Sequence, residues 1–149
     1  MSDGNPLKLM AKDLEDLSVI SGLVQDAIVP PADMTYLPDE GTFALALNRF
    51  QWERAGDSPP YSRSHAGLRI DNVKAVRRRG ISPSGDRERL LSLLAIAYAE
   101  GIDGAPNAIH LQFSEDRAVR LDVGDIAVAL SDLGEAWPTQ WKPGHEVVE

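Results

Sequence analysis

The stretch Met34–Trp52, MTYLPDEGTFALALNRFQW, decides the fold that the sequence predicts. Its second half places apolar side chains at every other position, Phe43, Leu45 and Leu47. This period of two is typical of a strand that buries one face. The segment Pro38–Gly41, PDEG, precedes the strand and has the composition of a tight turn. The stretch therefore predicts two extended segments joined by a tight turn, a hairpin around which the rest of the chain is organised.

The parity of the apolar positions changes at the end of this strand. Phe50 and Trp52 are even-numbered, whereas the earlier apolar residues are odd-numbered. An extra residue in one strand reverses the faces and bends the strand. The sequence therefore predicts a β-bulge near Asn48–Arg49.

The composition indicates one globular domain over residues 1–149. Residues 135–149 are expected to be irregular, and residues 1–9 are expected to be irregular or paired at an edge of the sheet. The chain contains no cysteine, which excludes disulfides, thiol nucleophiles and thiolate metal sites. No apolar run approaches the length of a membrane span, and the N-terminus carries acids where a signal peptide is basic. These features predict a cytoplasmic protein that does not bind membranes.

The charge is unevenly distributed along the chain, whose net charge is −8. The middle section from Arg49 to Arg89 holds ten Lys/Arg and five Asp/Glu, whereas the rest holds five and eighteen. Acidic termini that neutralise a basic middle within one fold are the simplest explanation. The overall negative charge disfavours general nucleic-acid binding.

Two helices are expected. Asp13 is a candidate N-cap for a helix that begins at Leu14 and ends near Ser21–Gly22. Near the C-terminus, the period changes to that of a helix with one apolar face, formed by Ile126, Ala129, Leu130 and Leu133.

Most of the remaining chain is predicted to be extended. Ser62–Ile81 is interpreted as a hairpin around the turn Asp71–Asn72, and alternation over 108–123 predicts a second hairpin. The apolar run Leu90–Ala99 fits either a central strand or a helix. A strand is favoured, because predicted hairpins precede and follow the run in the sequence, and the sheet needs a central strand between them.

Four segments together resemble a known family. They are the strand NRFQWE, the basic hairpin SRSHAGLRIDNVKAVRRRGI, the run LLSLLAIAYAE and the terminal piece AVRLDVGDIAVALSDLGEAW. The set resembles an uncharacterised proteobacterial family filed as a domain of unknown function, over roughly residues 7 to 145. This resemblance implies no activity, cofactor or catalytic residue.

A second resemblance, at the level of the fold, is to pleckstrin-homology-like barrels, in which curved antiparallel strands end in one amphipathic helix. The fold class expected is therefore α+β, a curved antiparallel barrel or sandwich with an N-terminal helix and a C-terminal amphipathic helix. We expect about seven or eight strands. Fold likeness alone does not specify function.

No pattern in the sequence indicates a catalytic or metal site. The three histidines, His65, His110 and His145, lie in different predicted elements, without the spacing of metal ligands. Ser64 and His65 are adjacent, so in a strand they point to opposite faces and cannot act as nucleophile and base. Neither a glycine-rich dinucleotide motif nor a phosphate-binding loop is present. No cofactor is therefore expected, although an enzyme whose site is assembled from distant residues stays open as a third class.

A basic cluster is the most pointed feature. Guanidinium groups suit phosphate and carboxylate, and the predicted basic hairpin would gather six cations in one ligand-binding patch. These are Arg63, Arg69, Lys74, Arg77, Arg78 and Arg79. The competing interpretation is an edge strand whose charges prevent aggregation.

Two tryptophans, Trp137 and Trp141, lie in the predicted irregular tail. Large aromatic side chains need cover, either from the barrel itself or from a second chain at an interface. The sequence therefore favours a non-catalytic binding or regulatory module that contacts a protein partner or a second copy. The alternative is an anion- or RNA-binding module that uses the basic hairpin.

Overall fold

The computed structural model describes residues 6–82 and 89–144. These residues form one α-helix, two 3-10 helices and ten strands. The elements are β1 (Lys8–Ala11), α1 (Leu14–Leu23), β2 (Ala27–Val29), η1 (Pro31–Asp33), β3 (Met34–Leu37), β4 (Thr42–Phe50), η2 (Trp52–Arg54), β5 (Tyr61–Ile70), β6 (Val73–Arg79), β7 (Leu91–Ala99), β8 (Asn107–Phe113), β9 (Arg117–Val123) and β10 (Val128–Thr139).

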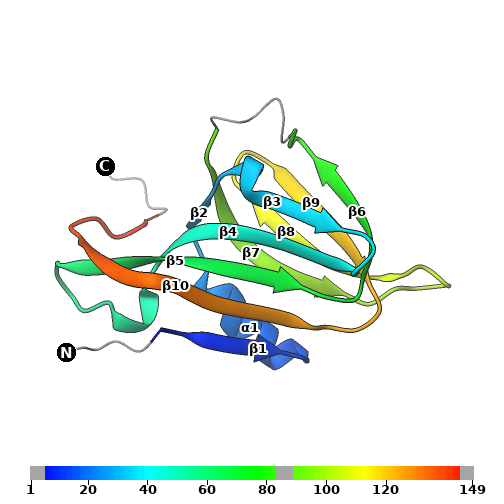
Figure 1. Cartoon of the computed structure of the whole chain (residues 1–149), viewed down its shortest axis with the longest axis horizontal. Coiled ribbons are helices and arrows are strands. Elements are labelled where there is room, and N and C mark those ends of the chain that lie inside the picture. The colour runs from blue at the N-terminus through cyan, green and yellow to red at the C-terminus, as the bar shows by residue number, and fades with distance from the viewer. Residues whose placement is uncertain (1–5, 83–88, 145–149) are drawn as a thin grey trace.

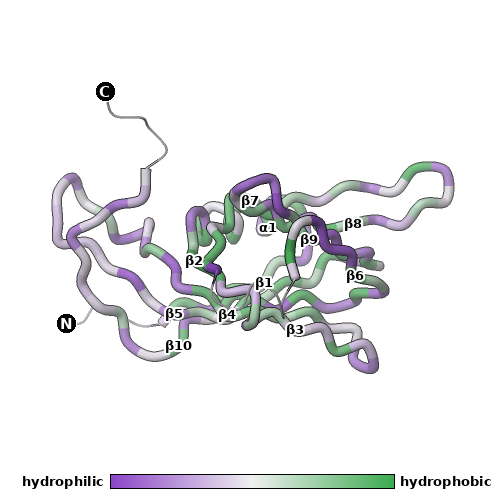
Figure 2. Tube along the Cα trace, turned by 90° about the horizontal axis from the view of Figure 1, so that it is seen from above, coloured by the Kyte–Doolittle hydropathy of each residue, from purple (hydrophilic) through white to green (hydrophobic). Residues whose placement is uncertain are grey.

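The strands make one curved antiparallel sheet in the order β1-β10-β5-β4-β2-β7-β8-β9-β6 (Figure 1). β4 pairs with β5 along one edge, and β3 and β2 share its other edge. β2 then continues the sheet onto β7, so it joins a half built on β4, β5 and β10 to a half built on β7, β8 and β9. In the view from above, β4, β5 and β10 lie in one layer and β7, β8 and β9 lie in the other (Figure 2). The sheet is curved but not closed, and β1 and β6 are its two ends.

The structure confirms the central hairpin. Phe43, Leu45 and Leu47 of β4 are buried on one face, and the turn before β4 has Gly41 at a φ of 62°. A positive φ at this position suits glycine, which has no Cβ to clash with the backbone. The expectation of a strand over Leu90–Ala99 is also confirmed, because β7 pairs with β2 and with β8. β8 and β9 form the second predicted hairpin.

The predicted bulge near Asn48–Arg49 is wrong. β4 and β5 pair from Phe43 to Phe50 without a register shift. The inward face simply continues to Arg49, a charged residue that the apolar pattern could not count, while Phe50 turns to the outer face. There the ring of Phe50 lies 4.7 Å from Trp52 and 5.5 Å from Tyr61, centroid to centroid. The change of parity therefore marks a second apolar cluster and not a bend.

The predicted C-terminal helix over Ile126–Leu133 is also wrong, because Val128–Thr139 is strand β10. β10 pairs with β5 on one edge, and its first residues, Val128–Ser131, also pair with β1 on the other edge. Val128 and Leu130 point into the core, whereas Leu133 is 51% exposed. Residues 135–139 belong to this strand, although an irregular tail was expected, and residues 8 and 9 belong to β1. The loss of the helix removes the feature on which the pleckstrin-homology-like resemblance rested.

The predicted basic hairpin is wrong as well, because β5 and β6 do not pair with each other. β5 lies between β10 and β4, whereas β6 pairs with β9. The turn that joins them is fixed by the loop after β9: the amide of Asp71 donates to the carbonyl of Ala127, and that of Gly124 donates to the carbonyl of Asn72. The turn therefore carries the chain from one half of the sheet to the other.

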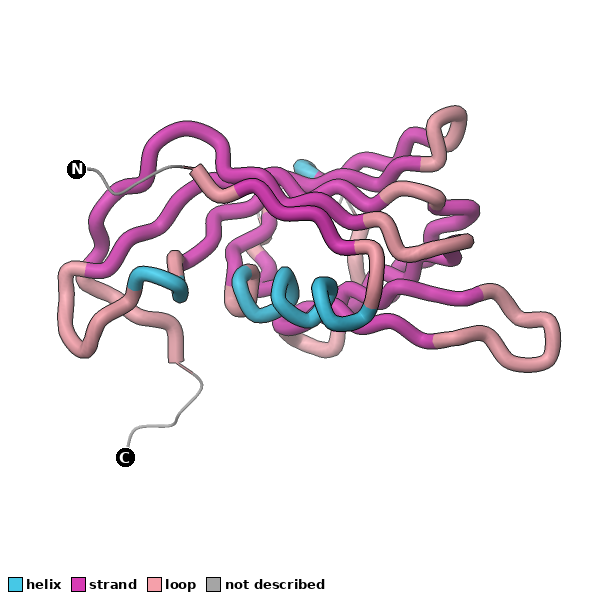
Figure 3. Tube along the Cα trace, turned by 90° about the horizontal axis from the view of Figure 1, so that it is seen from below, coloured by secondary structure: helices cyan, strands magenta, loops and turns pink. Residues whose placement is uncertain are grey.

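The N-terminal helix is confirmed. α1 begins at Leu14, and the carboxylate of Asp13 accepts a hydrogen bond from the amide of Asp16 at 2.8 Å. The helix buries Leu17 and Ile20 and packs against β1 and β7 (Figure 3). β2 covers the edge of β7 only as far as Leu93, and beyond this point α1 takes over. A helix laid against an open strand edge prevents that edge from pairing with another chain.

Ser21 makes the bond that holds α1 to this edge. Its Oγ accepts a hydrogen bond from the buried amide of Ile96 at 3.0 Å. A buried amide without a partner costs about 1–3 kcal/mol. The helix therefore supplies a main-chain partner as well as apolar cover.

We predict that Ser21→Ala destabilises the protein by about 1–2 kcal/mol, because the amide of Ile96 loses its acceptor. Ser18→Ala on the same helix is the matched control and should change the stability by less than about 0.5 kcal/mol. The midpoints of urea unfolding measure both effects. Equal midpoints for the two variants would show that the bond to Ile96 does not secure the helix.

Candidate functional site

A buried ionic cluster is centred on Arg49, near the end of β4. The side chain of Arg49 is fully buried, and its Nε and Nη2 atoms donate to the two carboxylate oxygens of Asp132 on β10 at 2.9 and 3.0 Å. Its Nη1 and Nη2 atoms donate to the carboxylate of Glu53 at 3.0 and 2.8 Å. Ser64 on β5 donates to Asp132 at 3.2 Å, and the amide of Leu7 donates to it at 3.0 Å. The cluster joins β4, β5, β10, η2 and the chain before β1.

The three charges shift one another's pKa values. Burial raises the pKa of Asp132, but hydrogen bonds from Arg49, Leu7 and Ser64 and the positive charge of Arg49 outweigh it, so the pKa lies below its ordinary value. The pKa of Glu53 is lowered in the same way, with burial again opposed by Arg49. For Arg49, burial lowers the pKa, but the two carboxylates more than reverse this. All three groups are therefore charged at neutral pH.

The groups of this cluster bind one another and anchor the surrounding elements. Arg49 is bidentate to both carboxylates, and Asp132 accepts four hydrogen bonds, so little capacity is left for a ligand. One buried atom, Oε1 of Gln51, has no partner in the described part of the chain. The sequence signal was the odd position of Arg49 in the apolar alternation. Glu53 lies only four residues further on, but Asp132 is distant in sequence, and no local pattern indicated it.

We predict that Asp132→Asn destabilises the protein by about 3 kcal/mol or more at pH 7, because a buried arginine loses a charged partner. The matched control is Arg69→Ala, which breaks the exposed pair of Arg69 with Asp71 and should cost less than about 1 kcal/mol.

The difference between the wild type and Asp132→Asn should depend on pH. A lowered pKa in the folded state contributes stability above the unfolded pKa of about 4, and this contribution is lost as the pH falls through the folded value. Urea unfolding from pH 7 down to pH 3 should therefore show the two proteins converging on the acidic side. A constant difference over this range would contradict the ionic role of Asp132.

The structure separates the six predicted basic residues. Arg63 and Arg69 lie on β5 in one half of the sheet, whereas Arg77, Arg78 and Arg79 lie on β6 in the other half. Lys74, also on β6, lies beside Gly124. Arg69 pairs with Asp71, and Arg79 pairs with Asp116, in both cases on the surface. The predicted patch is therefore divided between two strands that do not pair with each other, and Arg77, Arg78 and Arg79 follow one another on β6.

On the outer face, β6 continues into further basic residues on β9 and β8, which lie far from it in the sequence. Arg77 lies opposite Arg120 on β9, and Arg120 lies opposite His110 on β8. Residues directly opposite in adjacent strands present their side chains on the same face. The three side chains therefore make a row across the outer face, in which Arg120 also bonds Asp122 at 3.0 Å. The trace is hydrophilic at β6 in Figure 2.

The two tryptophans of the tail differ in their surroundings. Trp137, on β10, pairs across the sheet with Arg63, and its ring centroid lies 4.8 Å from that of His65. Trp141 is 81% exposed. Trp141 and Arg63 also line the same pocket, of about 550 Å³, between the C-terminal segment and strands β2 and β7. The structure thus joins residues of the two predicted groups in one place.

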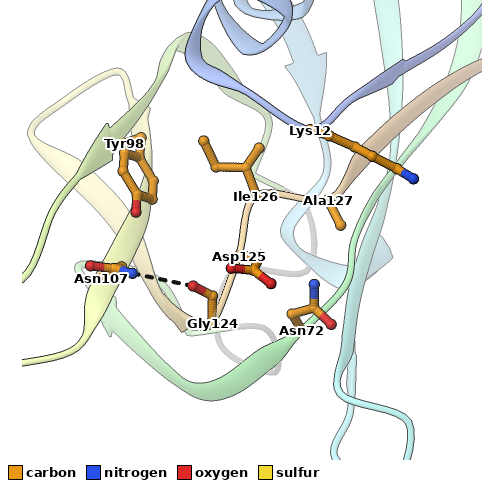
Figure 4. A pocket seen from close by; sticks show the side chains of 8 residues that line it. All are labelled: Lys12, Asn72, Tyr98, Asn107, Gly124, Asp125, Ile126 and Ala127. Carbon is orange, nitrogen blue, oxygen red and sulfur yellow. Dashed lines mark hydrogen bonds between the residues drawn. The ribbon is translucent and has the colours of Figure 1, made fainter.

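A second pocket of about 550 Å³ lies where several loops meet (Figure 4). Its floor is fixed by Asn107, which donates to the carbonyl of Gly124 at 3.2 Å and accepts from the amide of Gly101 at 2.8 Å. The polar side chains of Lys12, Asn72 and Asp125 also line it, but the ammonium group of Lys12 extends away from Asn107 in Figure 4. Tyr98 adds a phenol hydroxyl to the lining, so the pocket offers several hydrogen-bonding groups.

The histidines give no sign of a metal site. His65 and His110 lie in different halves of the sheet, and the described residues contain no group of three His, Cys, Asp or Glu that could hold an ion. His145 lies outside the described residues. Ser64 and His65 point to opposite faces as predicted, since Ser64 is buried against Asp132 and His65 contacts Trp137. Within 6–82 and 89–144, no helix is long and apolar enough to cross a membrane.

The residues that the structure describes form a mostly antiparallel β protein with an open, curved sheet and one α-helix. The chain belongs to the family described as "Protein of unknown function (DUF2948)", whose pattern matches residues 7–145. This confirms the resemblance to a domain of unknown function. Neither the curated proteins nor the solved structures gave a match to this sequence.

Proposed function

We propose that the protein is a non-catalytic binding module that recognises a segment of a partner protein by strand addition to β6. One observation supports this most directly: β6 is a terminal strand of the sheet and carries Arg77 and Arg78 without a hydrogen-bond partner in the described part of the chain. A cytoplasmic location, as expected from the sequence, is part of the proposal.

The main chain of β6 provides the docking edge. β6 runs from Val73 to Arg79 and pairs with β9 on one side. On the other side, the amide of Val73 donates to the carbonyl of Gly41, and no other strand of the described chain pairs there. An exposed edge of this length presents amide and carbonyl groups that an extended peptide can pair with.

The charges on β6 select the kind of partner. Two copies of β6 paired with each other would bring arginines together, which is unfavourable. Arg77 and Arg78 are exposed, and the pair between Arg79 and Asp116 is also exposed and therefore weak. An extended segment rich in Asp and Glu would gain charge-assisted hydrogen bonds in the same position. The partner that fits is therefore an acidic segment of a different protein.

The test is a double charge reversal, Arg77→Glu with Arg78→Glu. Repulsion should replace attraction, so the affinity for the partner should fall by about tenfold or more. Lys8→Glu with Lys12→Glu changes the net charge equally, on exposed residues outside β6, and should retain binding. Partners captured from the host lysate are compared quantitatively between the two double variants, and the partner that differs is purified and titrated.

Capture shows that a partner binds but not where it binds. Amide hydrogen exchange in β6 tests whether the partner adds a strand there. Binding of the purified partner should slow amide hydrogen exchange in residues 73–79, while exchange in α1 is unchanged. Equal capture by both double variants, or unchanged exchange in β6, would show that the partner does not dock on this edge.

Anion or RNA binding is the second candidate, and the row formed by Arg77, Arg120 and His110 favours it. If this row binds phosphates, Arg77→Ala and Arg120→Ala should each weaken binding of a short single-stranded RNA and each reduce the salt dependence by about one ion. Arg69→Ala, in the other half of the sheet, is the control. Fluorescence anisotropy at several salt concentrations measures this, and the absence of binding at low salt would eliminate the candidate.

A further inference from the structure

The pocket that contains Arg63 and Trp141 has the features of a small-molecule site. It lies against the outer face near β2, β5 and β7, and the C-terminal segment that contains Trp141 and Lys142 borders it. Its volume of about 550 Å³ is in the range of ligand pockets. The proposed docking edge, β6, contributes no residue to it.

Arg63 is held in place by an uncharged residue. Its Nε atom donates to the side-chain oxygen of Asn48 at 2.6 Å, and its Nη2 atom donates to the carbonyl of Asn48 at 3.0 Å. Nη1 has no hydrogen-bond partner among the described residues. A contrasting set of arginines lies within hydrogen-bonding or ion-pair distance of a carboxylate: Arg49, Arg69, Arg79, Arg89, Arg117 and Arg120. The guanidinium of Arg63 is thus oriented but keeps donors available for an anion.

The surroundings of Arg63 favour an added negative charge. Burial lowers the pKa of Arg63, and the charge of Asp26, which also lines the pocket, offsets this only in part. The second carboxylate of the lining, Glu115, is 3.0 Å from Arg89 and 3.7 Å from Arg117, so its charge is already engaged. A partly desolvated cation without a bonded carboxylate is stabilised when an anion binds.

Two further groups suit particular parts of a ligand. The Oγ of Ser114 accepts from the amide of Ser92 at 3.2 Å, which leaves its hydroxyl proton available to donate. The indole of Trp141 is 81% exposed and borders the same pocket. Exposed aromatic rings stack favourably on other planar rings.

We propose that this pocket binds a small planar aromatic molecule that carries a carboxylate or phosphate. The anionic group lies on Arg63, with Ser114 as a second donor, and the ring lies against Trp141. Lys142 adds positive charge at the rim.

Titration calorimetry with four probes tests the two parts separately: inorganic phosphate, benzoate, adenosine monophosphate and neutral indole. The aromatic anions should bind more tightly than phosphate or indole. Arg63→Ala should weaken their binding by about tenfold or more, since charge-assisted hydrogen bonds are lost. Arg69→Ala is the matched control, because Arg69 is on the same strand and pairs with Asp71, and it should leave binding unchanged.

If Arg63→Ala fails to fold, Trp141→Ala provides the test. The side chain of Trp141 is 81% exposed, so its removal leaves no cavity and the variant should fold. This substitution should weaken the binding of the aromatic anions several-fold and leave the binding of phosphate unchanged. Equal affinity for phosphate and the aromatic anions would overturn the role of Trp141. Absence of binding by every anion, or an equal loss in Arg69→Ala, would overturn the site itself.

Discussion

The buried ion cluster of Arg49, Glu53 and Asp132 links β4 directly to β10, two strands that β5 separates in the sheet, and to η2. A charge inside a protein is tolerated only when other groups replace its lost hydration. Arg49 meets this condition through two carboxylates, one on β10 and one in η2. The position of β10 between β1 and β5 is therefore fixed by an ionic contact as well as by main-chain pairing.

With β10 placed between β1 and β5, the other strand edges of the sheet differ in what covers them. α1 covers the edge of β7 that β2 leaves open, and β10 pairs with the inner edge of β1. β6 is left at the other end with arginines along it. Charged edges resist uncontrolled aggregation and also select partners of opposite charge. The same cations can therefore serve protection and recognition.

Arginine has three roles in this fold, which depend on what lies next to it. Arg49 is neutralised by carboxylates in the interior, and Arg77 is exposed at an edge. Arg63 is intermediate, because Asn48 orients it without neutralising it. This difference separates an anchor from the two surfaces proposed to bind ligands. The local sequence around each arginine does not reveal it.

The sequence predicted the elements in which local pattern and tertiary environment agree. The turn at Gly41, the alternation in β4, the Asp13 cap of α1 and the hairpin of β8 and β9 were all correct. β10 was missed because Val128–Leu133 fits a helix as well as a strand, and pairing on both edges decided between them. The basic hairpin was misjudged because a turn shows where the chain reverses but not which strand it then joins.

The sequence by itself determined where the chain turns and which side chains must be buried, since local backbone preferences and hydrophobicity control both. Only the tertiary structure decided that Arg49 binds Asp132, that Arg63 and Trp141 line one pocket, and that Arg77 lies beside Arg120. These contacts join residues distant along the chain, and strand order, which no local signal encodes, brings them together.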